Sequence, residues 1–130
     1  MTLWAPLGEF RDLFVAEAQE NLQALSNGAL KIERSGQDLS AVHDLFRAAH
    51  TLKGMAATMG FDGLTQVCHA MEDALDSVRS GAQPVTRAFA DALLAAVDAM
   101  GGMLGQVASG GDGGAAPAGL VERFHQLAAG

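Results

Sequence analysis

Two short segments in the middle of the chain, H-x-x-K-G at His50 and H-x-x-E at His69, carry the side chains best suited to chemistry. A neutral imidazole is a nucleophile through its unprotonated nitrogen, and a carboxylate that accepts the N–H of the other nitrogen selects this tautomer and raises its basicity. We expect Glu72 to hold His50 in this way, and the ammonium of Lys53 to stabilise negative charge on the group under attack. Gly54 leaves bare backbone beside the ring. The pattern predicts nucleophilic attack by His50 on a negatively charged group brought by a bulky partner.

The direction of the His50 side chain follows from the helical period. On a wheel of roughly 100° per residue, Leu45, Leu52 and Met59 fall far around the helix from His50. The apolar residues should face the core. His50 is therefore predicted to face solvent.

A simple count along the chain places Glu72 opposite His50. With Phe61 near the apex of a helical hairpin, His50 and Glu72 are equally far from the apex along the sequence, and so are Lys53 and His69. At about 1.5 Å of rise per residue, each pair lies at one height in the hairpin. A cluster of these four polar residues is possible, and the rotation of each helix decides whether it forms.

The segment around Glu72 also has two faces. Leu64, Met71 and Leu75 lie on its apolar side. The polar residues are predicted on the opposite side: His69, Glu72, Asp73 and Asp76. Glu72 is therefore expected to lie off the apolar face.

Apolar residues at spacings of three and four predict four long helices. The first is expected at about residues 7–33, with Pro6 near its N-terminus. Residues 35–40 should form a turn in which Asp38 or Ser40 caps the second helix.

The later helix boundaries follow from turn and capping residues. The second helix should end at Met59 or Gly60, and Asp62 is expected to be the N-cap of the third, which stops at "SGAQP". Pro84 or Val85 should open the fourth helix.

These segments predict an all-α fold, an up-down-up-down antiparallel four-helix bundle with a short fifth C-terminal helix. The bundle would occupy residues 1–108. Residues 109–119 have the glycine-rich composition of a flexible linker, and residues 120–130 would form the trailing helix. The sequence leaves open whether this fifth helix docks.

Composition narrows the class of partner. The chain has 130 residues and a net charge of -7, with only 8 Lys and Arg, which argues against nucleic acid. Cys68 is the one cysteine, so no internal disulfide can form, and the N-terminus has no signal-like pattern, so we expect a cytoplasmic protein. The most apolar region, residues 88–107, is interrupted by charges and glycines and makes a poor membrane span. A protein partner or a small ligand is more consistent with this balance.

The segments "FRAAHTLKGMAATMGF" and "LTQVCHAMEDALDSVRSG" resemble the histidine phosphotransfer (HPt) domain at the N-terminus of CheA-type chemotaxis histidine kinases. The resemblance covers about residues 10–81, and the combination of H-x-x-K-G with H-x-x-E at this distance is quite specific. It implies that His50 is the phosphorylated residue and that Glu72 orients it. It also implies that Lys53 and His69 are supporting polar neighbours.

The resemblance implies a place in a two-component chemotaxis pathway. His50 would accept a phosphoryl group from an ATP-bound kinase domain, in cis or in trans, and donate it to an Asp of a CheY-like response-regulator receiver. The domain would then be a phosphoryl carrier and kinase substrate, not catalytic by itself, cut from a longer transferase chain. No phosphate-binding G-x-x-x-x-G-K-[ST] loop is present. ATP and Mg would belong to the kinase domain and Mg to the receiver, with no cofactor or metal held here.

The receiver would dock over His50, around Gly54. Family members commonly have a second glycine or another small residue where this chain has Met55. On the wheel Met55 lies about 140° from His50 and should touch a neighbouring helix more than the incoming partner.

Two alternatives come from other functional classes. Histidines and carboxylates on facing helices can bind zinc or iron, although such bundle sites use Glu-x-x-His twice, whereas "HAME" runs the other way and occurs once. A purely structural docking bundle is the second. His43 and His125 are expected on the surface, and Cys68 is expected to be a buried, inert thiol.

Overall fold

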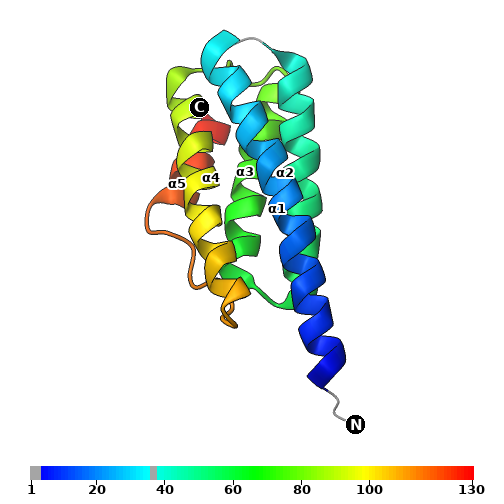
Figure 1. The fold of residues 1–130 in the computed structure, drawn as a ribbon. Coiled ribbons are helices and arrows are strands. Elements are labelled where there is room, and N and C mark those ends of the chain that lie inside the picture. Colours follow the sequence, from blue (N-terminus) through cyan, green and yellow to red (C-terminus); the bar gives the residue numbers. More distant parts are fainter. Residues whose placement is uncertain (1–3, 36–37) are drawn as a thin grey trace.

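The computed structural model describes residues 4–35 and 38–130, and the side chains within these ranges from residue 9 onward. These residues form five helices and no strand: α1 (Trp4–Ser35), α2 (Leu39–Met59), α3 (Asp62–Arg79), α4 (Arg87–Ala108) and α5 (Leu120–Ala129). Helices α1 to α4 run alternately up and down (Figure 1). The predicted all-α antiparallel bundle is confirmed.

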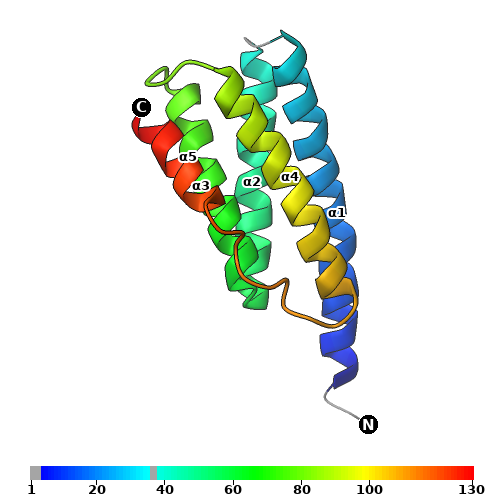
Figure 2. The same ribbon diagram turned by 90° about the vertical axis from the view of Figure 1, so that its left-hand side faces the viewer.

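The fifth helix is part of the packed structure. Helices α1 and α2, α2 and α3, and α1 and α4 pack as close neighbours, whereas the backbones of α3 and α4 lie farther apart. Helix α5 lies on α3 and also contacts α4, on the side of the bundle away from α1 (Figure 2). Phe124 of α5 is fully buried, as are Leu25, Leu52, Leu75 and Leu93 from the other four helices. Helix α5 therefore docks and closes the seam between α3 and α4.

A tight turn folds α3 back along α2. Gly60 ends α2 in the left-handed conformation, with φ of 77°, which favours glycine because it lacks a Cβ. The N–H of Phe61 donates to the carbonyl of Ala56 at 2.9 Å. The Phe61 ring is buried against Phe14 of α1, edge to face, with 5.1 Å between ring centroids. This apex sets the register that brings the middle of α3 beside the middle of α2.

The residues that cap the helices match the sequence-based prediction in part. Asp38 caps α2, because its Oδ1 accepts from the N–H of Ala41 at 3.0 Å. Residues 36 and 37 of the predicted turn lie outside the described residues. The prediction of Asp62 as the N-cap of α3 is wrong: Phe61 takes that position without a side-chain cap, and Asp62 is the first helical residue. Its charge there still suits the positive end of the helix dipole.

Helix α4 begins later than predicted. It starts at Arg87, not at Pro84 or Val85, because the Thr86 hydroxyl accepts from the N–H of Phe89 at 3.1 Å and fixes the N-cap. At the other end of the chain, α1 begins before residue 7 and ends after residue 33, which makes it longer than expected. Its first turns extend beyond the end of the bundle (Figure 1).

The linker between α4 and α5 takes a defined path across the start of α3. Gly63 is buried there, and a Cβ on it would lie 2.9 Å from backbone atoms of both Ala115 and Ala116. The glycine therefore lets the linker backbone lie directly on the helix. Composition predicts a flexible linker but contains no information about this contact.

Of the described helices, α4 is the one that is long and apolar enough to cross a membrane by length and composition. Its apolar side chains pack inside the bundle instead: Leu93, Met100 and Val107 are fully buried. The packing explains its apolar character as that of a core helix.

Candidate functional site

His50 stands on the outer face of α2, where its side chain is 64% exposed. Its sequence neighbour Ala49 and the residue two positions on, Leu52, are fully buried. The helical period therefore divides α2 as the wheel predicts, with the imidazole in solvent and the apolar residues in the core.

Glu72 of α3 reaches across to this histidine. It is the one charged residue buried in the described part of the chain, at 8% exposure. Its Oε2 is hydrogen-bonded to Nδ1 of His50, and its Oε1 accepts from Nζ of Lys53 at 2.6 Å. Both carboxylate oxygens thus accept hydrogen bonds from α2, and the one side chain of Glu72 binds both His50 and Lys53.

These contacts fix the tautomer of the imidazole. An ionised carboxylate only accepts hydrogen bonds, so Nδ1 of His50 must be the donor toward Glu72. In the neutral ring the other nitrogen, Nε2, then carries the lone pair. Because the ring is exposed, this nucleophilic nitrogen is available to an incoming group.

The pKa of Glu72 agrees with an ionised side chain. Burial by itself would raise the pKa of this carboxyl, but the hydrogen bonds from Lys53 and His50 and their positive charge outweigh burial and lower the pKa below 4.5. Glu72 is therefore ionised at neutral pH and able to hold the Nδ1 proton.

The helical wheel of α3 places Glu72 off the apolar face but does not predict how far it is buried. His69, Asp73 and Asp76 are exposed as expected, whereas Glu72 is buried at the seam between α2 and α3. A wheel drawn for α3 alone ignores the neighbouring helix, and α2 covers this edge. The burial costs little because both oxygens have partners.

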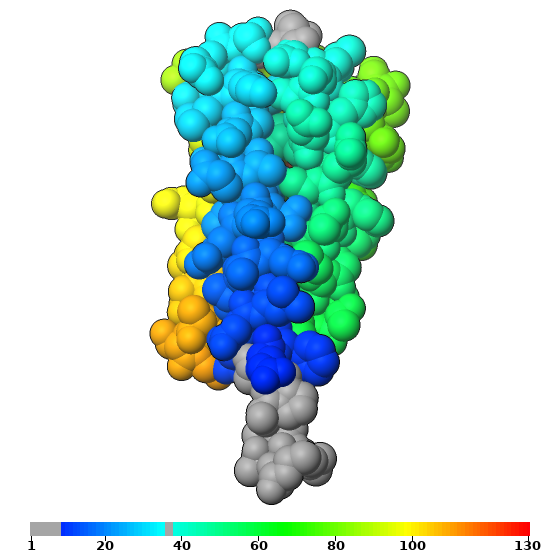
Figure 3. All heavy atoms as spheres, turned by 45° about the vertical axis from the view of Figure 1, so that its right-hand side comes forward, coloured from blue at the N-terminus to red at the C-terminus, as the bar shows by residue number. Residues whose placement is uncertain are grey.

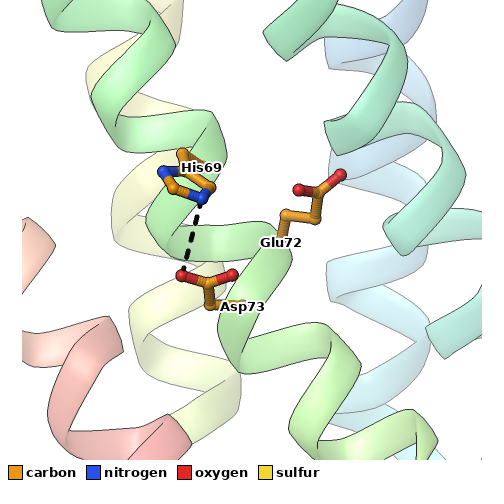
Figure 4. Close-up of side chains that lie close together, drawn as sticks. All are labelled: His69, Glu72 and Asp73. Carbon is orange, nitrogen blue, oxygen red and sulfur yellow. Dashed lines mark ion pairs between the residues drawn. The ribbon is translucent and has the colours of Figure 1, made fainter.

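His69 lies beside Glu72 without joining its hydrogen bonds. Its Nε2 is 3.8 Å from Oδ2 of Asp73, one turn further along α3. Figure 4 shows this pair on α3 and the carboxylate of Glu72 pointing away from it, toward α2. In the described structure His69 is therefore a neighbour of the site, and the structure brings together only three of the four predicted residues through direct contacts.

Among the described residues, His69, Glu72 and Asp73 form the group best placed to hold a metal ion. One ligand atom each from His69, Glu72 and Asp73 lies within 4.8 Å of the others. A metal there would compete with Lys53 and His50, which already bind the two carboxylate oxygens of Glu72. The donor set thus favours the hydrogen-bonded arrangement over a metal site.

Gly54 and Met55 lie where the sequence predicts. A Cβ at Gly54 would have no atom within 4 Å, so the surface next to His50 is open. Met55 is partly buried against the core, and its Sδ is 3.9 Å from Nδ2 of Asn21 on α1. Met55 therefore touches the neighbouring helix, as its wheel position indicates.

Sequence reasoning missed two residues that lie next to the imidazole. The ring of Phe46 is parallel to that of His50, with 6.3 Å between centroids and 8° between planes. The guanidinium carbon of Arg79, at the end of α3, lies 3.9 Å from the centroid of the Phe46 ring. The spacing of four residues between an aromatic residue and a histidine on one helix was the available signal for the first contact.

Cys68 has no part in this chemistry. It is fully buried, its Sγ lies 3.8 Å from Sδ of Met100, and burial raises the pKa of the thiol to about 12. The thiol is therefore inert, as the sequence predicts.

Comparison with known proteins places this geometry in a family. The family model described as "Hpt domain" matches residues 9–103. The chemotaxis protein CheA of Bacillus subtilis is 42% identical over 107 residues, which cover 82% of this chain and 16% of the relative. The CheA of Treponema pallidum is 42% identical over 98 residues, covering 75% of this chain and 12% of that protein. The chain thus spans less than a fifth of the length of these curated relatives.

Solved structures agree with the fold. The CheA phosphotransferase domain from Thermotoga maritima is 37% identical, with a TM-score of 0.73, and the match covers 77% of this chain and 95% of that one. The phosphorylated P1 domain of CheA3 from R. sphaeroides, solved in complex with CheY6, is 25% identical with a TM-score of 0.81, covering 94% of this chain and 97% of that one. With an exposed histidine, a buried carboxylate on its Nδ1 and a family match over most of its length, this chain belongs to the Hpt domain family.

Proposed function

We propose that this domain carries a phosphoryl group on Nε2 of His50, which it receives from an ATP-bound kinase domain and passes to an aspartate of a response-regulator receiver. One observation carries the proposal: an exposed imidazole has its Nδ1 bound by a buried, ionised Glu72, which leaves Nε2 as the free nucleophile.

In the first step, the lone pair of Nε2 attacks the γ-phosphorus of ATP. The N–P bond forms while the bond from phosphorus to the bridging oxygen breaks, and ADP leaves with that electron pair. The Nδ1 proton stays between His50 and Glu72, so the positive charge that develops on the ring lies against a carboxylate. Glu72 thus serves both as the orienting group and as the counter-charge.

Lys53 contributes positive charge beside the ring. In the structure its ammonium donates to Glu72 at 2.6 Å, which stabilises the ionised carboxylate. An ammonium has further N–H donors, and we assign to these the stabilisation of phosphoryl oxygens on His50. His69, 60% exposed beside Glu72, has the weaker role of a polar neighbour.

In the second step, a carboxylate of the receiver attacks the same phosphorus. The N–P bond breaks, its electron pair returns to Nε2, and the neutral Nδ1–H tautomer is restored. ATP and Mg belong to the kinase, and Mg also to the receiver, because their phosphates and carboxylates attract it. The domain itself needs no cofactor in this scheme.

The surface for the receiver would lie over α1 and α2, which run side by side on one face (Figure 3). Gly54 provides open surface next to the ring, and a groove between the two helices is lined in part by the polar residues Asn21, Lys31, Arg47 and Thr51. The solved complex of the R. sphaeroides domain with CheY6 supports a response regulator as this partner.

The rest of the pathway is proposed from the relatives, which are chemotaxis proteins. The donor would be a CheA-type kinase domain, in the same chain or in another one. The domain would work in the cytoplasm, where a lone buried thiol stays reduced. Neither nucleic acid nor direct membrane insertion has a place in this scheme.

The test is phosphorylation of His50→Gln by a CheA-type kinase domain with radiolabelled ATP. We expect acid-labile labelling of the wild-type domain and none of the variant. His43→Gln is the matched control, because His43 is an exposed histidine on the same helix. Persistent labelling of His50→Gln would place the phosphorylated residue elsewhere.

A further inference from the structure

The hydrogen bond to Glu72 restrains only one atom of the His50 ring. The side chain is 64% exposed, and the torsion that turns an imidazole about its stem has a broad, shallow energy profile. A ring held only through Nδ1 could still tilt about that contact. The direction of the Nε2 lone pair would tilt with it, so a second contact is needed to fix the plane of the ring.

Phe46 supplies a contact of the required kind. One helical turn before His50 on α2, its ring lies within 8° of parallel to the imidazole, offset at 6.3 Å between centroids. Offset parallel stacking is a favoured arrangement of two flat rings because it avoids direct overlap of their π-electrons. The stacking acts on the ring plane, which the hydrogen bond to Glu72 leaves free.

Phe46 is itself held from α3. The guanidinium carbon of Arg79 lies 3.9 Å from the centroid of the Phe46 ring, the distance of a close cation–π contact. Nη2 of Arg79 also donates to Oδ1 of Asp76 at 2.6 Å, which restrains the guanidinium. The Phe46 side chain is also partly buried against the hydrophobic core. The imidazole is therefore linked to α3 twice, through Glu72 at Nδ1 and through Arg79 and Phe46 at the ring plane.

We propose that Phe46 is a positioning residue for phosphoryl transfer at His50, and that Arg79 holds its ring in place. The inference rests on the proposed function, in which Nε2 of His50 attacks phosphorus. In-line attack requires the lone pair to point along the bond that forms, so a fixed ring plane raises the fraction of productive encounters. Loss of the Phe46 ring should therefore change kcat of phosphorylation and not KM, because Phe46 does not bind ATP or the kinase in this scheme.

The experiment compares Phe46→Leu with Phe46→Tyr. Leucine keeps an apolar side chain but loses the flat aromatic face, whereas tyrosine keeps that face. We expect Phe46→Leu to lower kcat of phosphorylation by about three- to tenfold, the range that the loss of one aromatic stacking contact predicts, with KM unchanged. Phe46→Tyr should stay within about twofold of the wild-type kcat on the same grounds.

Val97→Ala is the control for a general loss of packing, because Val97 is partly buried on α4, away from the site. The control should lower the melting temperature without lowering kcat. NMR of the unphosphorylated domain gives an independent readout: contacts between the protons of the Phe46 and His50 rings should be present in the wild type. The Phe46→Tyr variant should keep these contacts.

Three results would overturn the proposal. They are a wild-type kcat for Phe46→Leu, an equal loss in Phe46→Tyr, or an equal loss in Val97→Ala. If Phe46→Leu does not fold, Arg79→Gln decides, with the exposed Arg87→Gln as its control. Arg79→Gln should weaken the contacts between the rings and lower kcat, and unchanged values would reject the role of the stack.

Failure of the proposed function would look different. In that case His50→Gln would still be labelled, whatever the state of the Phe46 ring. Labelling that depends on His50 but not on Phe46 would refute the positioning role alone.

Discussion

The ionised carboxylate of Glu72 is the group whose removal tests the site most directly. Glu72→Gln keeps the length and shape of the side chain and removes its charge. In the wild type both oxygens accept from α2, one from Lys53 at 2.6 Å and the other from Nδ1 of His50. The amide has a single acceptor oxygen, so at most one of these donors keeps its partner.

The magnitude follows from the difference between charged and neutral hydrogen bonds. Bonds to a charged group contribute about 1.5–3 kcal/mol and neutral ones about 0.5–1.5 kcal/mol. The Glu72 side chain is only 11% exposed, so water replaces little of the hydrogen-bond energy lost at this position. His50 and Lys53 are more exposed and recover part of that energy through hydrogen bonds to solvent. We expect the free energy of unfolding to fall by ~1–2 kcal/mol, which lowers Tm by roughly 3–8 °C in a domain of this size. A loss of ~1.4 kcal/mol at the imidazole corresponds to phosphorylation that is about tenfold slower.

The assay measures the initial rate of phosphorylation by a CheA-type kinase domain at saturating ATP, together with Tm. NMR of the imidazole nitrogens reports the tautomer, and the Nδ1–H form should lose population in the variant. Asp73→Asn is the matched control, because it removes an exposed carboxylate one residue further along α3. Its rate and its tautomer should match the wild type.

A rate for Glu72→Gln within about twofold of the wild type would refute the orienting role, since less than about 0.4 kcal/mol would then separate the two proteins at the transition state. A tautomer unchanged in the variant would show that the carboxylate does not select the proton position. A slower rate with an unchanged tautomer would assign to Glu72 the counter-charge alone.

Three further predictions concern pH, Gly54 and Gly63. Because the pKa of Glu72 is lowered in the folded state, its stabilisation is present above the unfolded-state pKa and is lost as the pH falls through the folded-state value. The difference in unfolding free energy between wild type and Glu72→Gln, measured with urea, should therefore shrink as the pH falls through the folded-state pKa of Glu72. A difference that stays the same across this range would contradict the assignment. Gly54→Phe should leave Tm unchanged or higher, since a Cβ at this position meets no atom within 4 Å. The variant should nevertheless slow phosphoryl transfer to the receiver, because the new ring occupies the open surface beside His50. Transfer at the wild-type rate would show that the receiver does not need this open surface. Gly63→Ala should lower the free energy of unfolding by ~1–3 kcal/mol and speed hydrogen exchange in α5. The control Gly102→Ala places its Cβ in open space and should raise the free energy of unfolding by up to ~1 kcal/mol. Equal effects of the two substitutions would reject the contact between the linker and α3.

The helices could be predicted from the sequence because their apolar residues keep one period throughout. His50 is exposed for the same reason: its position is fixed by the period of α2 alone. Helix ends were less predictable where two residues competed for a cap. Thr86 caps α4 although Pro84 and Val85 precede it, and Phe61 takes the position predicted for Asp62. Capping depends on the backbone path into the helix, which single-residue preferences do not specify.

Features that depend on two helices at once were only partly predictable. The count from the hairpin apex places Glu72 level with His50, yet its burial depends on how far α2 overlaps α3. The contact of Arg79 with Phe46 joins the end of one helix to the middle of another, and no spacing in the sequence encodes it. The close contact of the linker with α3 depends on the missing side chain of Gly63, and only a structure in which the linker lies against this residue shows why glycine is needed there.

The burial of α5 has a practical consequence for anyone who wishes to produce this domain. The match to the family model ends at residue 103, before α4 is complete and before the fifth helix begins. A recombinant fragment that ends at that residue would lack Phe124 and Leu120 and would expose apolar side chains along α3. Such a fragment should self-associate or precipitate, so cloning boundaries are better drawn beyond residue 129.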